Sequence, residues 1–237
     1  MKKTIVITGA SRGIGKAIAI ELAGKDTNIV INCVNNVDKL NEVKSIIEEK
    51  GSVCETFIGD MGNYSDVQKM FDMCLQRFGQ VDVLINNAGI SVVGLFQDMG
   101  ENEWHRICNT NIDSVFNCCH FAVKDMMKRH CGKIINISSV WGLYGASCEV
   151  AYSATKGAVN SFTKALAKEL APSGIQVNAV ACGAIDTEMN GHLSDDDKAS
   201  LAEEIPAGRF GSPQEVAKLV KSLSGMNSYL CLLYTSP

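Results

Sequence analysis

Short apolar runs alternate with amphipathic stretches along most of the chain. Runs of strand length, rich in β-branched residues, cover residues 4–8, 29–33, 53–58 and 81–86. Apolar positions recur at helical spacing between them, over residues 14–22, 40–49 and 67–78. The second half continues in the same way, with helices over residues 112–130, 151–170 and 213–223 and strands over residues 133–138 and 175–181. This alternation predicts a parallel sheet whose strands are joined by helices.

The predicted strands are apolar at successive positions, which is typical of a sheet covered by helices on both faces. No Pro-, Gly- or Ser-rich linker and no internal repeat divides the chain. We therefore expect an α/β protein, a single doubly wound parallel sheet with helices on both faces, forming one Rossmann-type domain over residues 1–230. Residues 186–210, rich in Asp, Glu, Gly and Met, interrupt the alternation and predict a mobile lid over a site.

Composition limits the classes of function. With 237 residues, 46% of them hydrophobic and only four prolines, the chain can bury a large core. The net charge of −4 gives no basic field, so nucleic acid and anionic membrane surfaces are not expected partners. No apolar run has the length of a membrane span or a signal-peptide core, which predicts a cytoplasmic protein. The ten cysteines are scattered with no C-x-x-C pair, which predicts reduced thiols and no metal site.

A glycine-rich turn follows the first predicted strand. Residues 8–15 read T-G-A-S-R-G-I-G, and helical periodicity begins at their end. Glycines at a strand-to-helix turn let backbone N–H groups approach a pyrophosphate, which then lies at the positive end of the helix. The spacing of Gly9, Gly13 and Gly15 is not G-x-G-x-x-G, so a turn without a ligand is the alternative. The position after the first strand favours a dinucleotide cofactor.

The end of the second predicted strand indicates which cofactor is used. An acidic side chain there would bind the ribose 2′-hydroxyl of NAD. Residues 32–36 read N-C-V-N-N and hold no carboxylate that would repel a 2′-phosphate. Arg12 in the glycine turn could bind that phosphate, although it could also be a solvated surface charge. We therefore predict NADPH rather than NAD.

A candidate catalytic set lies in the second half of the chain. Tyr152 and Lys156 are spaced i, i+4 at the start of a helical segment and share one helix face. We expect the Lys156 ammonium to lower the pKa of Tyr152 from its usual value near 10, so that the phenol can exchange a proton with a substrate oxygen. Such a pair alone is more often a helical surface pair. Ser139 after the preceding strand, and Asn111 early in the long helix before it, favour a catalytic set.

Together these motifs resemble the short-chain dehydrogenase/reductase family over residues 3–230. The resemblance rests on T-G-x-x-x-G-I-G at residues 8–15, N-N-A-G at residues 86–89, and the ordered serine, tyrosine and lysine. It implies that Ser139 holds a substrate carbonyl and Tyr152 supplies the proton. It also implies that Lys156 binds the nicotinamide ribose and Asn111 supports a relay water. The implied cofactor contacts are Gly9, Ser11, Arg12, Gly13, Ile14, Gly15, Asp60, Met61, Asn87, Ala88, Gly89, Tyr152, Lys156, Gly183, Ile185 and Thr187.

Ser138 and the turn after the sixth predicted strand both lie near the catalytic set. Ser138 adjoins Ser139, and the family register, thirteen residues before the tyrosine, favours Ser139. After the sixth strand the family usually has a P-G turn, whereas this chain has Cys182 and Gly183. Losing the fixed φ of proline is expected to loosen that turn.

The sequence leaves the ketone open. The chain most resembles bacterial 3-oxoacyl-acyl-carrier-protein reductases, which implies a ketone on a carrier protein and docking at basic residues such as Arg129 or His130. Glu149, three residues before Tyr152, suits a substrate bearing a cation. The nearby G-A-S-C-E-V also resembles reductases of the 5-aminopentanone modification on elongation factor P. Alternatively, Glu149 is only a helix-end charge, or the domain is a non-catalytic NADPH sensor.

The last residues depart from the family pattern. After Leu230 the family continues into a final strand, whereas residues 231–237 read C-L-L-Y-T-S-P. We expect these residues to be a non-native tail and the sheet to lack its last strand, the alternative being a short natural strand within residues 232–234. For the full-length form the resemblance implies a homodimer or homotetramer.

Overall fold

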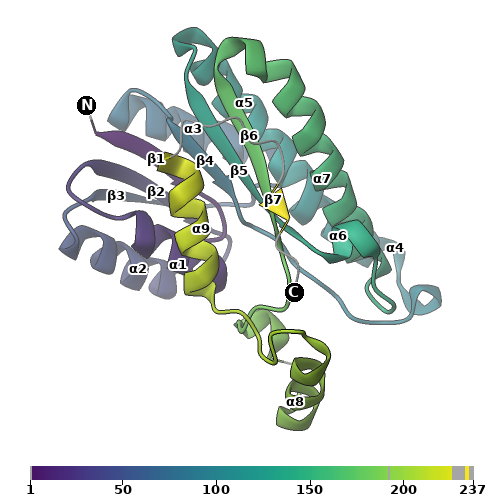
Figure 1. Cartoon of the computed structure of the whole chain (residues 1–237). Helices are drawn as coiled ribbons and strands as arrows, with labels where there is room; N and C mark the ends of the chain where they lie inside the picture. Colours follow the sequence, from purple (N-terminus) through teal and green to yellow (C-terminus); the bar gives the residue numbers. More distant parts are fainter. Residues whose placement is uncertain (1, 192, 226–232, 235–237) are drawn as a thin grey trace.

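A parallel sheet forms the centre of the molecule, as the alternating pattern predicts (Figure 1). The computed structural model describes residues 2–191, 193–225 and 233–234. The strand order is β3-β2-β1-β4-β5-β6-β7. The strands are β1 (Lys3–Ile7), β2 (Thr27–Cys33), β3 (Val53–Ile58), β4 (Val83–Asn86), β5 (Gly132–Ser139), β6 (Ile175–Cys182) and β7 (Leu233–Tyr234). The predicted doubly wound α/β fold is confirmed.

Helices cover both faces of the sheet and create two apolar cores. In β1, Ile5 and Ile7 belong to one core and Val6 to the other, because successive strand residues point to opposite faces. The first core is closed by α1 (Gly13–Leu22), α2 (Val37–Glu49) and α9 (Pro213–Gly225). The second is closed by α3 (Tyr64–Phe78), α5 (Ser114–Arg129) and α7 (Val150–Leu170).

The winding reverses between β1 and β4. These neighbouring strands pair in parallel, Ile7 beside Ile85, and their chains leave the sheet in opposite directions. In open α/β sheets, ligands bind in the crevice at the carboxyl ends of the strands where this reversal occurs. The topology therefore places a candidate binding site at the ends of β1 and β4.

Several short elements lie outside the predicted pattern. The long helix predicted from residue 112 is preceded by α4 (Glu101–Cys108), in which only Ile107 is buried, and by one π-helical segment, η2 (Asn109–Asp113). The link from β5 to α7 contains α6 (Trp141–Tyr144). The predicted lid contains η4 (Glu188–Asn190) and α8 (Asp195–Glu204), which projects from the body in Figure 1.

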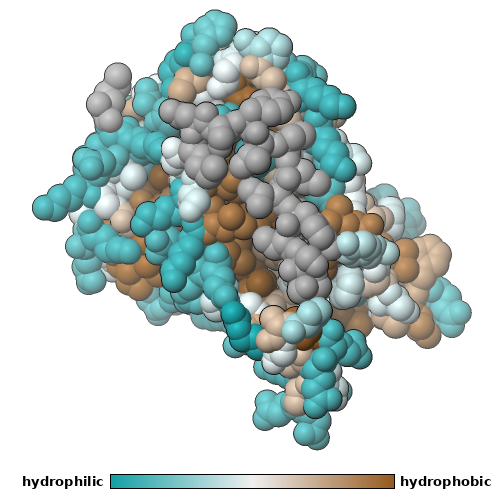
Figure 2. Space-filling model, in the orientation of Figure 1, coloured by the Kyte–Doolittle hydropathy of each residue, from teal (hydrophilic) through white to brown (hydrophobic). Residues whose placement is uncertain are grey.

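The sheet edge beyond β6 has a short seventh strand. Leu233 and Tyr234 of β7 pair with Val180 and Ala181 of β6, within the range given for the short-strand alternative. Figure 2 shows hydrophobic residues gathering beside α9 on this face. A cavity of about 250 Å³ lies there, lined in part by Val180, Val216 and Leu219. Residues 231, 232 and 235–237 of the predicted tail lie outside the described residues. No helix among the described residues is long and apolar enough to span a bilayer.

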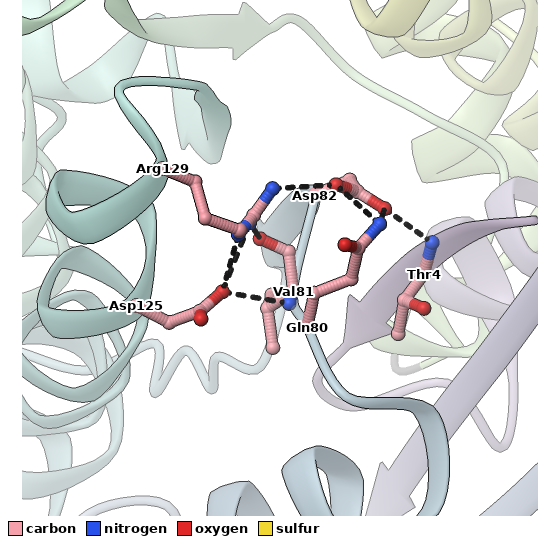
Figure 3. A network of polar contacts seen from close by, with 6 residues as sticks. All are labelled: Thr4, Gln80, Val81, Asp82, Asp125 and Arg129. Carbon is pink, nitrogen blue, oxygen red and sulfur yellow. Dashed lines mark hydrogen bonds and ion pairs between the residues drawn. The ribbon is translucent and has the colours of Figure 1, made fainter. Parts of the chain in front are cut away.

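A polar network fastens α5 to the amino ends of two strands (Figure 3). The Arg129 guanidinium donates to Asp125 at 2.9 Å, to Asp82 at 3.0 Å and to the Val81 carbonyl. Asp82 also accepts from the Thr4 backbone N–H at 2.8 Å. Arg129, named above as a docking residue, is therefore engaged inside its own domain, because its guanidinium satisfies two shielded carboxylates.

Candidate active site

The glycine turn is joined to the end of β4 by short hydrogen bonds. The Thr8 hydroxyl accepts from the backbone N–H groups of Asn87 and Ala88, both at 3.0 Å. The Asn87 side-chain amide donates back to the carbonyls of Thr8 and Gly9, also at 3.0 Å. The two motifs predicted to hold the cofactor therefore form one unit at the β1–β4 crevice.

Glycine is required at two points of this unit. Gly9 has φ +64°, and a Cβ there would lie 2.8 Å from the Ala88 Cα. A Cβ on Gly15 would lie 2.4 Å from the Gly9 carbonyl oxygen. Real Cβ atoms do not approach backbone this closely, and φ > 0 further disfavours a side chain. The close approach explains the glycines by packing alone and does not by itself indicate a ligand.

The start of α1 does indicate an anionic ligand. Arg12 is the N-cap residue and makes no side-chain cap, and the first turn holds no acidic residue. The first N–H groups of a helix need acceptors, and together they favour an anion. Ser11 is buried in the turn, and Ile14 packs partly against the first core. An uncapped helix end beside an arginine fits the pyrophosphate of a dinucleotide.

Arg12 is exposed and is paired with a carboxylate. Its Nη1 lies 3.0 Å from Oε2 of Glu188 in η4, and the Nζ of Lys39 lies 3.1 Å from Oε1 of the same carboxylate. Lys39 stands in the first turn of α2, just after β2. The sequence prediction of a 2′-phosphate site named Arg12 and missed Lys39. The signal was the position of Lys39 shortly after the second strand, just beyond residues 32–36.

Asp60 and Met61 lie just after β3. Asp60 accepts from the Gly62 N–H at 2.8 Å and from the Asn109 side chain at 3.2 Å, which fixes its carboxylate at the mouth of the crevice. Met61 is 2% exposed and belongs to the second core. Only its backbone is therefore available for the predicted cofactor contact.

Ser139 and Tyr152 face each other at the end of β5. Their hydroxyls are hydrogen-bonded, and the Ser139 oxygen also accepts from the Trp141 N–H at 3.2 Å. The Ser138 hydroxyl instead points toward the Lys156 carbonyl, at 3.4 Å. The structure thus brings Ser139, and not Ser138, to the tyrosine.

Lys156 lies beside the Tyr152 ring and is buried. Its Nζ donates to the Ile137 carbonyl at 2.9 Å and stands 5.6 Å from the centre of the tyrosine ring. Burial lowers the pKa of Lys156 to about 8. Burial also raises the pKa of Tyr152, against the effect of its hydrogen bond to Ser139. The predicted lowering of the tyrosine pKa is therefore wrong, because burial outweighs the hydrogen bond to Ser139.

Asn111 lies in η2 and not in the long helix where the sequence placed it. Its side chain donates to the Ile90 carbonyl at 2.9 Å and to the Thr155 hydroxyl at 3.0 Å, and accepts from the Ile90 N–H at 2.9 Å. A Cβ built on Gly89 would lie 3.4 Å from both the Asn111 oxygen and the Lys156 Nζ. Gly89 thus leaves room between these two polar groups. A π-helical segment is frequent at functional sites because it re-aims a side chain.

The segment after β6 closes over the glycine turn. Burial raises the pKa of the Cys182 thiol to about 11. The charge of the nearby Lys156 ammonium acts in the opposite direction and lowers it. Gly183 follows it, and Ile185 forms an isolated bridge with Gly211. The Thr187 methyl lies 3.6 Å from where a Cβ on Gly13 would be, which places Thr187 above the turn. The predicted contacts after β6 therefore border the crevice.

Glu149 stands at the start of α7, beside the catalytic set. The Ser91 hydroxyl donates to its carboxylate at 2.5 Å, and its charge helps to raise the pKa of Tyr152, after burial. Glu149 makes no side-chain cap to the helix. The sequence did not single out Ser91, although it lies two residues beyond N-N-A-G.

Exposed apolar side chains surround this end of the site. A backbone bond from Gly94 to the Cys148 carbonyl, 2.9 Å, joins the segment after β4 to the segment before α7. Val93, Leu95, Phe96 and Tyr144 on these segments are all more than half exposed. Figure 2 shows apolar side chains on the projecting loop that carries η1 (Phe96–Asp98). The segments beside the start of α7 therefore carry an exposed apolar rim.

A doubly wound sheet with a phosphate-type turn after β1 and a tyrosine, lysine and serine gathered at its carboxyl edge defines the class of dinucleotide-dependent oxidoreductases. Residues 3–198 match the family model described as short chain dehydrogenase. The chain belongs to the short chain dehydrogenase family.

Named relatives and solved structures extend this comparison. The chain is 40% identical over 224 residues to 3-oxoacyl-[acyl-carrier-protein] reductase FabG of Staphylococcus epidermidis, covering 94% of the chain and 92% of the relative. The Salmonella typhimurium protein of the same name is 37% identical over 222 residues, covering 94% and 89%. A structure described as ElxO with NADP bound superposes with TM-score 0.90 at 33% identity, covering 99% and 97%. A variant of actinorhodin polyketide ketoreductase with NADPH gives TM-score 0.91 at 30% identity, covering 99% and 96%.

Proposed function

We propose that this protein reduces a ketone to a secondary alcohol with NADPH. The observation that carries the proposal is the meeting of Ser139, Tyr152 and Lys156 at the carboxyl edge of the sheet, beside a glycine turn that fits a pyrophosphate. The solved relatives described with NADP or NADPH support the choice of cofactor.

Each residue of the set has a defined task in this proposal. Bound NADPH would supply the hydride for the carbonyl carbon. The Ser139 and Tyr152 hydroxyls would donate hydrogen bonds to the carbonyl oxygen, where negative charge develops. Tyr152 would then pass its proton to that oxygen. Lys156, protonated below about pH 8, would stabilise the resulting phenolate, and Asn111 would hold a water through which the proton is restored.

The first substrate class is a 3-oxoacyl chain carried by acyl carrier protein. The curated relatives bearing that name, at 37% and 40% identity, support it. The exposed apolar rim of Val93, Leu95, Phe96 and Tyr144 would receive an acyl chain. His130 is an exposed candidate for carrier docking, whereas Arg129 is occupied.

A second substrate class is favoured by Glu149. Its carboxylate accepts a hydrogen bond from a neutral serine, Ser91, and is paired with no cation among the described residues. A ketone ending in an ammonium group, such as the 5-aminopentanone group on elongation factor P, would supply that cation. The anionic arm of a carrier protein would instead be repelled.

The test is NADPH oxidation measured with an acetoacetyl thioester and, separately, with an amino-ketone. Tyr152→Phe is the matched variant, because it removes one hydroxyl and keeps the ring. Turnover of the thioester that disappears in Tyr152→Phe supports the first class, and turnover of the amino-ketone alone supports the second. Tight NADPH binding without turnover of either ketone contradicts both substrate classes and favours the sensor.

Glu149→Gln separates the two substrate classes further. If Glu149 binds an ammonium, the KM for the amino-ketone rises about tenfold or more, while the KM for a neutral thioester stays within about twofold. Equal changes for both substrates would assign Glu149 to the structure of the α7 terminus.

We also propose that the full-length form is a cytoplasmic homodimer or homotetramer. The described cysteines are free thiols, the state that a reducing compartment maintains. Phe116 and Met127 on α5 are exposed apolar side chains that a second copy would cover. Light scattering at micromolar concentration tests the assembly, and a monomer would contradict it.

A further inference from the structure

Three charged side chains meet above the glycine turn. Glu188 follows Thr187 in the lid segment. Its Oε2 accepts a hydrogen bond from the Arg12 Nη1 at 3.0 Å. Lys39 donates to both of its oxygens, at 3.1 and 3.3 Å. The three residues are far apart in sequence and belong to the glycine turn, α2 and η4. The Glu188 carboxylate is thus held by two cations, one from the glycine turn and one from the start of α2.

The pair of cations matches a phosphate better than a carboxylate. A phosphate monoester has up to two charges and three oxygens, so it can satisfy an arginine and a lysine together. Arg12 follows β1 and Lys39 follows β2, and in this fold the ribose 2′ position lies at the end of the second strand. The Glu188 carboxylate therefore occupies two cations that lie after the first and second strands.

We propose that Glu188 is an internal competitor for the 2′-phosphate of NADPH, and that displacement of its carboxylate from Arg12 and Lys39 releases the lid segment, residues 186–210, from the glycine turn. The inference rests on the proposed use of NADPH. A cofactor without the 2′-phosphate has no group that replaces Glu188 on the two cations, so it leaves the lid anchored. Glu188 and Lys39 thereby become determinants of cofactor choice, in addition to Arg12.

The physical basis is a competition between anions at a surface site. Glu188, Arg12 and Lys39 are each about half exposed, with side-chain exposures of 51, 56 and 47%. Water and ions reach such a site, and each exposed pair is weak enough for a doubly charged ligand to replace it. The two cations hold the pKa of Glu188 below its usual value, so the carboxylate is charged whenever NADPH is.

The binding test uses fragments that carry only the adenosine end. Calorimetry is run with 2′,5′-ADP, which has the phosphate, and with 5′-AMP, which lacks it. Glu188→Gln is expected to tighten 2′,5′-ADP about five- to tenfold and to leave 5′-AMP within about twofold. Lys39→Gln is expected to weaken 2′,5′-ADP about fivefold or more. Glu204→Gln is the matched control, because it removes the same charge from the same segment at an exposed position for which the described residues offer no ion pair.

The release of the lid is tested by hydrogen–deuterium exchange in peptides from residues 186–210. In the wild type, 2′,5′-ADP should speed exchange there, and 5′-AMP should not. In Glu188→Gln, exchange should already be fast without ligand. Equal affinities of Glu188→Gln and Glu204→Gln, or exchange that 2′,5′-ADP leaves unchanged, would overturn the inference. Wild type that binds 5′-AMP and not 2′,5′-ADP would instead overturn the proposed use of NADPH.

Discussion

Lys156 combines a charge with nearly complete burial, and this has a measurable effect on stability. Its pKa falls from 10.5 to about 8 in the folded protein because burial disfavours the ammonium. Between these values the unfolded chain binds one more proton than the native state, so stability rises with pH. Relative to Lys156→Met, the wild-type free energy of unfolding should rise by about 2 kcal/mol between pH 8 and about pH 10. Urea denaturation of both proteins across this range measures it, and a constant difference would contradict the buried charge.

Gly9 is a site where one methyl group should matter. In Gly9→Ala the new Cβ would meet the Ala88 Cα at 2.8 Å, in a backbone conformation with φ +64°. We expect a loss of about 2 kcal/mol or more, together with weaker cofactor binding. Gly24→Ala is the control, since its Cβ would have no heavy atom within 4 Å, and it should change stability by less than about 0.5 kcal/mol. Equal melting temperatures for the two variants would refute the close approach of the two turns.

For single residues, the sequence identified the candidate site residues but not how deeply they are buried or which side chains they contact. The i, i+4 spacing placed Tyr152 and Lys156 on one helix face, and both do point to the same site. Their pKa values depend on burial by β5, β6 and α6, which no local pattern reveals, so the predicted tyrosine shift had the wrong sign. The pairing of Arg12 with Glu188 spans 176 positions and was likewise outside the reach of a motif.

Among the elements, the junction of α5 with β4 and β1 depends on one arginine. The Asp82 and Asp125 side chains that Arg129 binds are 16 and 15% exposed, so its removal would leave two shielded carboxylates without their cation. Arg129→Met should cost about 2–3 kcal/mol of stability. Arg77→Met should cost about 0.5 kcal/mol or less, because the Arg77–Glu55 pair is exposed. Chemical denaturation of both variants measures the difference. Equal losses of unfolding free energy would show that Arg129 does not stabilise the junction.

Elements that carry a continuous apolar run or are bounded by turn glycines were predictable, and those with neither signal were missed. The β3 bounds agree with the prediction, because residues 53–58 are bounded by a turn glycine and by Gly59. In contrast, α4 buries only Ile107, so its sequence carries no apolar stripe. The π-helical segment η2 arises from the fit of Asn111 to Ile90 and Thr155, which depends on tertiary contacts.

For the whole molecule, cofactor binding should appear as added stability. A ligand at about one hundred times its dissociation constant adds about 2.7 kcal/mol to the free energy of unfolding. For a domain of this size that raises the melting temperature by about 5–10 °C. NADPH should give this shift, NADH at the same concentration a smaller one, and Tyr152→Phe the same shift as the wild type. Equal shifts from the two cofactors would contradict the preference for NADPH.

The hydrogen bonds between Thr8 and the end of β4 also constrain the order in which the protein folds. Thr8 and Asn87 are 79 positions apart, and β4 reaches β1 only when the crossovers between them are in place. A chain leaving the ribosome with β1, α1 and β2 complete therefore holds all three glycines of the turn but lacks the support for its shape. Contacts of such long range form late in folding. Recovery of NADPH binding during refolding should consequently follow sheet assembly and not the earlier appearance of helix.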